Sequence, residues 1–268
     1  MTEKILNALS DIIDTHTHPI NSADYRLHCK SALDAKGALI LPNFLTHEAI
    51  AIIQKEGIQE QKSAFYTKSS HTVYLLPPDS NFPEDHIRNR QIHSSKGCIT
   101  TDQIPQHSPL HTLYEDTHFK SFLCSILGEQ ALYPYADSLS SINLHYASAG
   151  QELGWHYDHS SFAITLLIQK PQQGGNFEFV RNVRDADKNE MAFENTRKIL
   201  DKETNATALS FDVGDLVLFR GRNSIHRVTA TEGDTTRMLV VLAYNTAPGI
   251  ALSESARKTF FGRVGEVL

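Results

Sequence analysis

The chain has 268 residues, of which 40% are hydrophobic, and this is enough for one domain with a sizeable core or for one domain with an extension. Its formal net charge of −6 argues against a dedicated nucleic-acid or membrane-surface binder, which would carry a basic patch. The cysteines Cys29, Cys98 and Cys124 include no Cys-x-x-Cys pair, which favours reduced thiols over a disulfide framework or a zinc knuckle.

The first twenty residues contain no targeting signal but one conspicuous metal-like motif. MTEKILNALS lacks the basic start and apolar core of a signal peptide, and no apolar run approaches the roughly 18 residues of a membrane span, so we expect a cytoplasmic protein. In the next stretch, DIIDTHTHPI, a short apolar run is followed by His16 and His18. This resembles the metal-binding end of the first strand in a barrel hydrolase. That fold needs βα units with further ligands at later strand ends, and residues after 20 lack this alternation. We expect an extended segment with no metal role, with hydrolysis kept as one alternative.

The N-terminal half is predicted to be mainly helical. Residues 20–36 are helix-compatible, 38–41 form a short strand, and a helix begins after its cap Thr46 and ends at Gly57. Residues 59–106 are polar, with LLPPDSNFPEDH forming a loop, and 108–130 contain two helices closed by Gly128.

From residue 139 onward the pattern changes to short strands. SSINLHYA, FAITLLIQK, GNFEFVR, ALSFDVGDLVLFRG and TRMLVVLAYNT are rich in β-branched and aromatic residues, with Gly214-Asp215 as a hairpin turn signal. Residues 184–205 are a charged, helical insertion, either a lid or a solvated helix, and 253–263 form a closing helix. We predict one structural unit: a helical extension (1–130), a mostly β, double-stranded β-helix core of the cupin-like jelly-roll type (131–250), and a C-terminal helix (251–268).

The predicted core contains a facial set of metal ligands. His156 and Asp158 in GWHYDHSS are two residues apart at a strand end, so their side chains point to one face. His226 in RNSIHRV supplies a third ligand. Two histidines and one carboxylate leave half of the coordination sphere open, which suits non-haem Fe(II) with a cosubstrate and dioxygen.

A 2-oxoglutarate cosubstrate would need a cation for its distal carboxylate. Arg237 lies eleven positions after His226 on the next predicted strand, and a guanidinium grips a carboxylate with two parallel hydrogen bonds. Tyr146, on the strand before the first two ligands, is a candidate hydroxyl donor. Its neighbour His145 must point to the opposite face, so only one of the two can face the cavity.

Residues 143–245 resemble the iron(II)/2-oxoglutarate-dependent oxygenases. The pattern that carries this resemblance is Tyr146, Gly150-Gln151, His156-x-Asp158, Gly175, Gly214-Asp215, His226-x-Val228, Gly233 and Arg237. LPNFLTHEAI, SKGCITTDQIP, RGRNSIHRVT and LSESARKTFFGR extend the resemblance to the radical halogenases of free amino acids such as lysine and to their hydroxylating relatives.

That resemblance implies a particular reaction. The halogenases have glycine in place of the metal carboxylate, which opens a position for chloride, whereas this chain retains Asp158. We therefore expect an enzyme that uses Fe(II), 2-oxoglutarate and O₂ to hydroxylate an unactivated C–H bond of a small polar molecule, most simply a free amino acid, with no nucleic-acid or membrane partner.

The sequence does not decide which residues contact the substrate. The candidates are Asn245 on the face of Arg237, His159 beside the metal motif, Arg222 and Asn223 before His226, and Asp137 as a partner for an amine. Two alternatives remain: an oxygenase for a protein-bound or carrier-bound residue, and a cupin-like module that binds metal and ligand without turnover.

Overall fold

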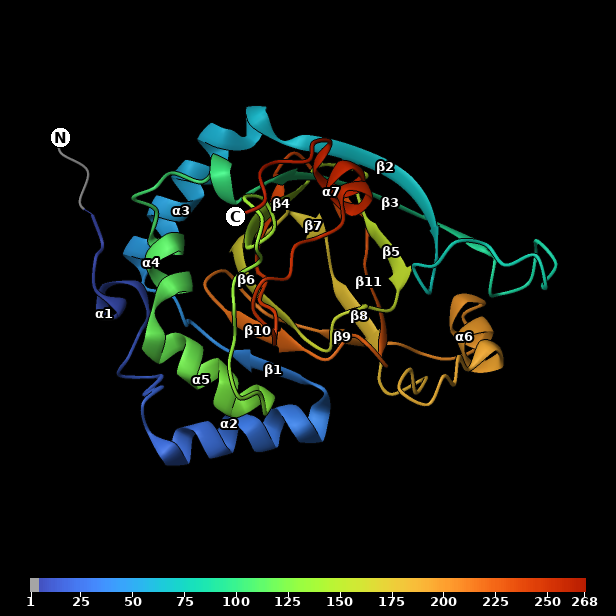
Figure 1. Cartoon of the computed structure of the whole chain (residues 1–268), viewed down its shortest axis with the longest axis horizontal. Helices are drawn as coiled ribbons and strands as arrows, with labels where there is room; N and C mark the ends of the chain where they lie inside the picture. The colour runs from blue at the N-terminus through green and yellow to red at the C-terminus, as the bar shows by residue number, and fades with distance from the viewer. Residues whose placement is uncertain (1–4) are drawn as a thin grey trace.

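A large antiparallel sheet that curls around a central space dominates the computed structural model, which describes residues 5–268 (Figure 1). The helices are α1 (Leu9–Ile12), α2 (Ala23–Lys36), α3 (His47–Glu60), α4 (Pro109–Glu115), α5 (Thr117–Leu127), α6 (Phe193–Leu200) and α7 (Glu254–Phe261), with short 3₁₀ turns at Gln61–Ser63 and Thr101–Gln103. The strands are β1 (Ala38–Leu41), β2 (Phe65–Thr72), β3 (Gln91–Ile99), β4 (Ile142–Ala147), β5 (Leu153–His156), β6 (Ala163–Gln169), β7 (Gln173–Gly174), β8 (Phe177–Val180), β9 (Thr207–Leu209), β10 (Leu216–Phe219), β11 (Ile225–Val228), β12 (Thr231–Glu232) and β13 (Arg237–Leu242).

Eleven of these strands form the curled sheet, in the order β1-β10-β6-β13-β4-β3-β5-β11-β8-β9, with β2 paired to β3. The long strand β3 lies between the strands β1-β10-β6-β13-β4 and the strands β5-β11-β8-β9 and joins them. Its Ile99 end pairs with β4, while Ser94 pairs with Leu153 of β5. All neighbouring strands are antiparallel and most are not consecutive in the chain, as in a double-stranded β-helix. The predicted mostly β, jelly-roll class is confirmed.

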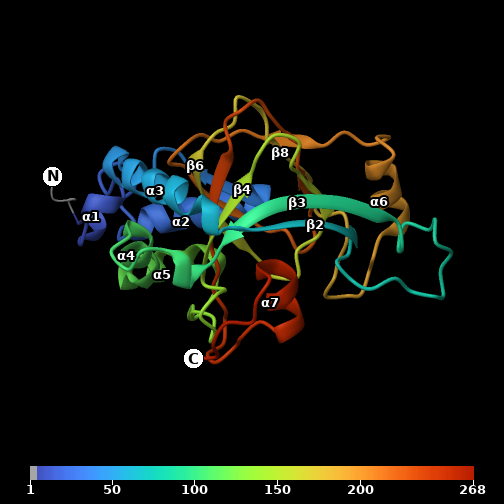
Figure 2. The same cartoon turned by 90° about the horizontal axis from the view of Figure 1, so that it is seen from above.

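The N-terminal helices cover one side of this sheet. Figures 1 and 2 show α1 to α5 together on one side and α6 on the opposite side. One apolar cluster joins these helices to the sheet, and it includes Leu33, Ile53, Phe122, Leu144 and Val240, all at most 2% exposed. No helix of residues 5–268 combines the length and apolar character that a membrane crossing requires.

Most of the predicted elements are present, with small shifts at their ends. The helices expected at 20–36, 108–130 and 253–263 and the strand at 38–41 are confirmed, and the Thr46 hydroxyl caps α3 by accepting from the Ala49 N–H. Within the 184–205 insertion only α6 is helical. Residues 11–20 are not simply extended, because α1 reaches Ile12.

The loop predicted at LLPPDSNFPEDH is confirmed, but the prediction for residues 59–106 missed two strands that flank it. β2 and β3 pair over eight registered residue pairs, and only 73–90 connects them irregularly. The strand pattern was hidden because both faces of this hairpin are polar: one faces solvent and the other carries Thr67, Ser69 and Lys96 toward a cavity.

The roles predicted for two glycines, a helix end at Gly57 and a hairpin turn at Gly214-Asp215, are wrong. α3 continues through Gly57 to Glu60, because a Cβ at Gly57 would lie 2.8 Å from Leu144 Cδ2, so the glycine serves helix-to-sheet packing rather than termination. Gly214-Asp215 forms a turn but not a hairpin, since β9 pairs with β8 whereas β10 pairs with β1 and β6.

Candidate metal centre

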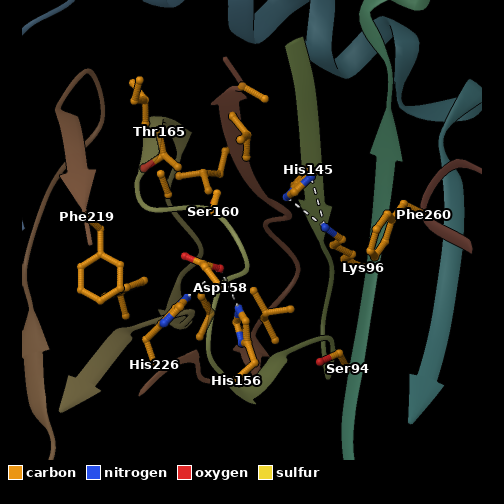
Figure 3. Close-up of a pocket in the computed structure, with 18 of the residues that line it drawn as sticks. Ser94, Lys96, His145, His156, Asp158, Ser160, Thr165, Phe219, His226 and Phe260 are labelled. Carbon is orange, nitrogen blue, oxygen red and sulfur yellow. Dashed lines mark hydrogen bonds and ion pairs between the residues drawn. The ribbon is translucent and has the colours of Figure 1, made fainter. Parts of the chain in front are cut away.

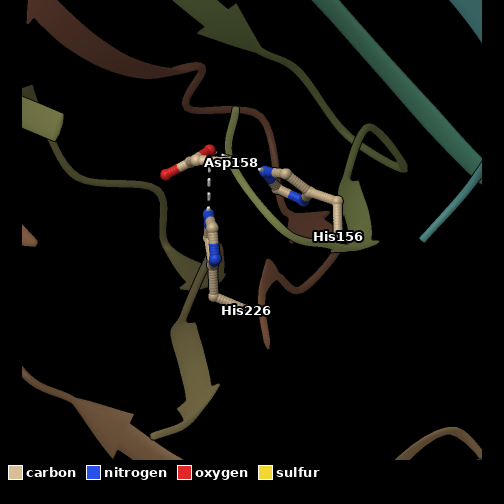
Figure 4. Close-up of side chains that lie close together, drawn as sticks. All are labelled: His156, Asp158 and His226. Carbon is tan, nitrogen blue, oxygen red and sulfur yellow. Dashed lines mark ion pairs between the residues drawn. The ribbon is translucent and has the colours of Figure 1, made fainter. Parts of the chain in front are cut away.

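Three ligand side chains meet where β5 and β11 run side by side. His156 ends β5 and is the direct cross-strand partner of His226 in β11, so both imidazoles lie on the same face of the sheet. Asp158 follows His156 by two residues, and its backbone N–H donates to Gly221. Figure 4 shows the three side chains converging. Within residues 5–268, this is the one group of at least three potential ligands whose donor atoms all lie within 4.8 Å of one another.

Backbone carbonyls set the tautomer of both histidines. His156 Nδ1 lies 2.8 Å from the carbonyl of Gly154, and His226 Nδ1 lies 3.0 Å from that of Ser224. A carbonyl only accepts, so each Nδ1 carries the proton and each Nε2 presents a lone pair. These Nε2 atoms lie 3.7 and 3.5 Å from Asp158 Oδ1. The two imidazoles are thus oriented as metal ligands, with carbonyls in the supporting role that such sites use.

The electrostatics of the three residues also favour a cation. Burial, reinforced by His226, lowers the pKa of His156 to about 3, so its imidazole is neutral and able to coordinate. Burial opposes ionisation of Asp158, but His226 and His156 outweigh it and lower the carboxyl pKa to about 2. The Oδ2 atom of Asp158 is buried with no hydrogen-bond partner. An ionised carboxylate with an unsatisfied buried oxygen fits a metal ion at this position.

A cavity of about 360 Å³ opens beside the three ligands (Figure 3). Arg237, the first residue of β13, lines it and is 6% exposed. Its guanidinium has no hydrogen bond or ion pair to any residue of the described part of the chain. Burial lowers its pKa to about 10, which still leaves it charged at neutral pH. A buried cation without a partner, facing a cavity, is suited to hold a carboxylate.

The prediction that Tyr146 donates a hydrogen bond into the cavity is wrong, because Tyr146 does not line it. Tyr146 is fully buried on the outer face of β4, and its hydroxyl donates to the carbonyl of Gly57 in α3 at 2.7 Å. His145 is the residue of this pair that lines the cavity. β4 is covered on both faces, so polarity alternation along the strand did not reveal which side faces inward.

The five suggested substrate contacts all lie outside the cavity lining. Asp137 is buried and accepts from the Leu139, Ser140 and Leu252 N–H groups, which is a purely structural role. The others stabilise loops: Asn245 reaches Ile250, the His159 ring lies near the Tyr74 carbonyl, Arg222 binds Asp187 and the His159 carbonyl, and Asn223 accepts from Ala186.

Other polar residues line the cavity that the sequence interpretation missed. Lys96 on β3 lies 3.2 Å from His145 Nε2, and His71 on β2 bonds to the Ser94 hydroxyl at 2.7 Å. The signal that could have found them is the i, i+2 spacing of polar residues in the β2–β3 segment, for which the sequence analysis predicts no strand.

In the DIIDTHTHPI motif, the His18 ring and the Asp14 carboxylate are both engaged in structural contacts. His18 is 3% exposed, and its two ring nitrogens already contact the Tyr25 hydroxyl at 2.6 Å and the Pro42 carbonyl at 2.8 Å. Asp14 instead caps its own turn through His16 and Thr17. Both imidazole nitrogens of His18 therefore have a structural partner.

Comparisons with known proteins identify a family and a shared fold. A family model described as Halogenase D matches residues 78–259. No curated protein sequence matches the chain. Among solved structures, a 2OG-Fe(II) oxygenase family oxidoreductase from Burkholderia pseudomallei is similar, with a TM-score of 0.52, 14% identity, and coverage of 84% of this chain and 92% of the other.

Two further solved structures share the fold. AviO1 from Streptomyces viridochromogenes has a TM-score of 0.54 and 13% identity, with coverage of 85% of this chain and 97% of the other. The epimerase SnoN, solved with Fe³⁺, alpha ketoglutarate and nogalamycin RO, has a TM-score of 0.58 and 11% identity, covering 92% of this chain and 96% of the other. At such low identity these likenesses show the fold alone.

Proposed function

The chain belongs to the Halogenase D family, and from this membership and its ligand set we propose that it is an iron(II)- and 2-oxoglutarate-dependent dioxygenase that hydroxylates a small polar molecule. The fold it shares with 2-oxoglutarate oxygenases supports this reaction class. Two imidazoles and one carboxylate on one side of a site are the ligand set that suits Fe(II) with open positions opposite.

The observation that carries hydroxylation rather than halogenation is the position of Asp158. Its carboxylate lies within 3.7 Å of both imidazole Nε2 atoms, so it fills the third place of the facial set. The resemblance to radical halogenases implies that those enzymes keep this place free by having glycine there. With Asp158 in it, the place that the halogenases keep for halide is taken, and the open positions opposite would serve 2-oxoglutarate and dioxygen.

Arg237 supports 2-oxoglutarate as the cosubstrate. When bound, iron(II) and 2-oxoglutarate supply the oxidising chemistry with dioxygen. His156, Asp158 and His226 would hold the metal, and Arg237 would hold the distal carboxylate through its unpaired guanidinium. The apolar side chains of Phe177 and Phe219, which also line the cavity, would exclude water from the reacting atoms.

The enclosed cavity supports a small-molecule substrate, and we propose a free amino acid. Its volume of about 360 Å³ lies within the range of small-molecule sites, and the polar groups converging in it would orient a compact polar ligand. α7 lies at one end of the barrel and contributes Phe260 to the lining, which leaves less room for a bulky carrier protein.

The test is a product assay on the purified protein with iron(II), 2-oxoglutarate, air, chloride and a pool of the standard amino acids, read by mass spectrometry. We expect one amino acid to gain a single oxygen in step with succinate formation, and none to gain chlorine. An Asp158→Gly variant should lose this hydroxylation, because the third ligand is removed while both histidines stay.

Each of the other outcomes rejects part of the proposal. A chlorinated product from the wild-type protein contradicts the argument from Asp158. Succinate without an oxidised amino acid rejects free standard amino acids as substrates. Failure of the protein to bind iron(II) and 2-oxoglutarate, measured by visible absorption of the anaerobic complex, rejects the reaction class itself.

A further inference from the structure

The cavity has an excess of positive charge that the proposed reaction does not use. Two cations line it, Lys96 and Arg237, whereas Asp158 is the single carboxylate among its lining residues within 5–268. Once Asp158 holds the metal and Arg237 holds 2-oxoglutarate, Lys96 is left without an anionic partner. An ammonium that is partly withdrawn from water is unfavourable unless it is paired, so this lysine is expected to serve a ligand.

The contacts of Lys96 leave room for such a ligand. Its ammonium lies 3.2 Å from Nε2 and 3.4 Å from Nδ1 of His145, and it forms no ion pair with any described residue. Burial, Lys96 and Arg237 keep the pKa of His145 well below its usual value, so His145 is a neutral acceptor for one of the three ammonium protons. The remaining N–H groups are free to donate. Figure 3 shows the two side chains pointing toward one another, with Phe260 next to Lys96.

Lys96 and Arg237 form separate positions rather than one clamp. Ala147 pairs with Arg237, and the register of β3 with β4 makes Ala147 the neighbour of Lys96, so about 10 Å of backbone separates the two cations. One carboxylate on Arg237 therefore does not neutralise Lys96.

We propose that Lys96, oriented by His145, binds a carboxylate of the primary substrate, and that the substrate is an organic acid or amino acid whose reacting part is uncharged. This inference rests on the proposed function. The cavity offers no carboxylate besides the metal ligand to pair with a basic side chain, and Leu75, Leu153 and Phe162 give it apolar walls. An apolar amino acid held by its carboxylate fits these walls, whereas lysine would bring an unpaired ammonium among them.

The test measures binding of matched probes to the anaerobic protein loaded with iron(II) and saturating 2-oxoglutarate. Hexanoate, hexanamide and hexylamine share one carbon chain and differ in their head group, and calorimetry gives their affinities. We expect hexanoate to bind at least about tenfold more tightly than hexanamide, since its hydrogen bonds to the ammonium are charge-assisted, and hexylamine to bind most weakly.

Variants assign the preference to Lys96. Lys96→Met should weaken hexanoate about tenfold or more while leaving 2-oxoglutarate affinity within about twofold, and Lys96→Arg should retain part of the preference. Lys68→Met is the matched control, because Lys68 is exposed on the outer face of the same hairpin. Arg237→Met should instead weaken the binding of 2-oxoglutarate and leave hexanoate affinity unchanged. Thermal unfolding of each variant confirms that it is folded.

The outcomes separate this inference from the function on which it rests. If iron(II) and 2-oxoglutarate do not bind to the wild-type protein, both fail. If they bind but hexanoate shows no advantage over hexanamide, only the carboxylate site is wrong. If Lys96→Met weakens 2-oxoglutarate as strongly as Arg237→Met does, Lys96 belongs to the cosubstrate and the proposal is overturned.

Discussion

Gly221 limits the space behind the carboxylate of Asp158. A Cβ at this position would collide with Asp158 Oδ2 and would lie 2.8 Å from His226 Cε1. The carbonyl of Gly221 also accepts from the Asp158 N–H, so the two segments are held together at this point. The absence of a side chain at residue 221 is thus a requirement of the metal centre, although Gly221 is not itself a ligand.

A Gly221→Ala variant tests this requirement. It retains all three ligands but forces the carboxylate away from the histidines, so we expect iron(II) affinity to fall by roughly tenfold or more, the usual cost of disturbing an outer-shell contact. The measurement is metal content after dialysis together with a titration under anaerobic conditions. A Lys68→Ala variant on the exposed face of β2 is the control. Unchanged affinity in Gly221→Ala would show that Asp158 has other room to move.

At the scale of elements, the sequence predicted the strands with clear apolar signals and missed those whose two faces look alike. The helices α2, α4 and α5 and strand β1 followed from caps, glycines and apolar spacing. β2 and β3 are polar on both faces, because one face is exposed to solvent and the other contributes polar side chains to the cavity. β4 is buried on both faces, so the inward residue could not be told from its neighbour. The metal ligands could be predicted without knowing which face points inward, because His156 and Asp158 are two residues apart and their side chains share one face.

The position of His156 depends on the distance between β3 and β5. The residue that permits their close approach is Gly154. A Cβ at Gly154 would collide with the backbone carbonyl of His93 and with the side chain of Ile92 in β3. The Gly154 N–H donates to Ser94 Oγ at 2.9 Å, and its carbonyl fixes the His156 ring. Glycine at this position allows β5 to lie close enough to β3 for both contacts.

Substituting Gly154 by alanine should therefore disturb both stability and the metal site. We expect the free energy of unfolding to fall by about 1–3 kcal/mol, as in other overpacked interiors, because backbone atoms rather than a flexible side chain must move. Iron(II) affinity should fall with it, since His156 shifts. Urea unfolding and metal titration measure the two effects, with Lys68→Ala on exposed β2 as control. A fully stable variant with normal metal affinity would mean that β3 and β5 can separate without cost.

At the scale of the whole molecule, the cavity concentrates histidines that the folded state keeps neutral. Burial is the largest cause of the lowered pKa of His71, His145 and His156, and for His156 the value falls to about 3. In the unfolded chain each returns to a pKa of about 6.5. Below that value the unfolded chain binds protons that the folded chain does not, so acid favours unfolding.

The metal-free protein should therefore lose stability as pH falls below about 6.5, with the full contribution of these histidines present above it. A fully buried neutral histidine contributes about 1.4 kcal/mol between pH 7.5 and pH 5.5. His71 and His145 contribute less because both are partly exposed, so we expect a total loss of about 2–4 kcal/mol. Urea unfolding at the two pH values measures it. His145→Gln removes one titrating group without emptying the site, and its loss over this interval should be smaller by roughly 1 kcal/mol. Equal stability of the wild-type protein at both pH values would mean that the cavity admits protons to these histidines, and the neutral acceptor assigned to His145 would then be wrong.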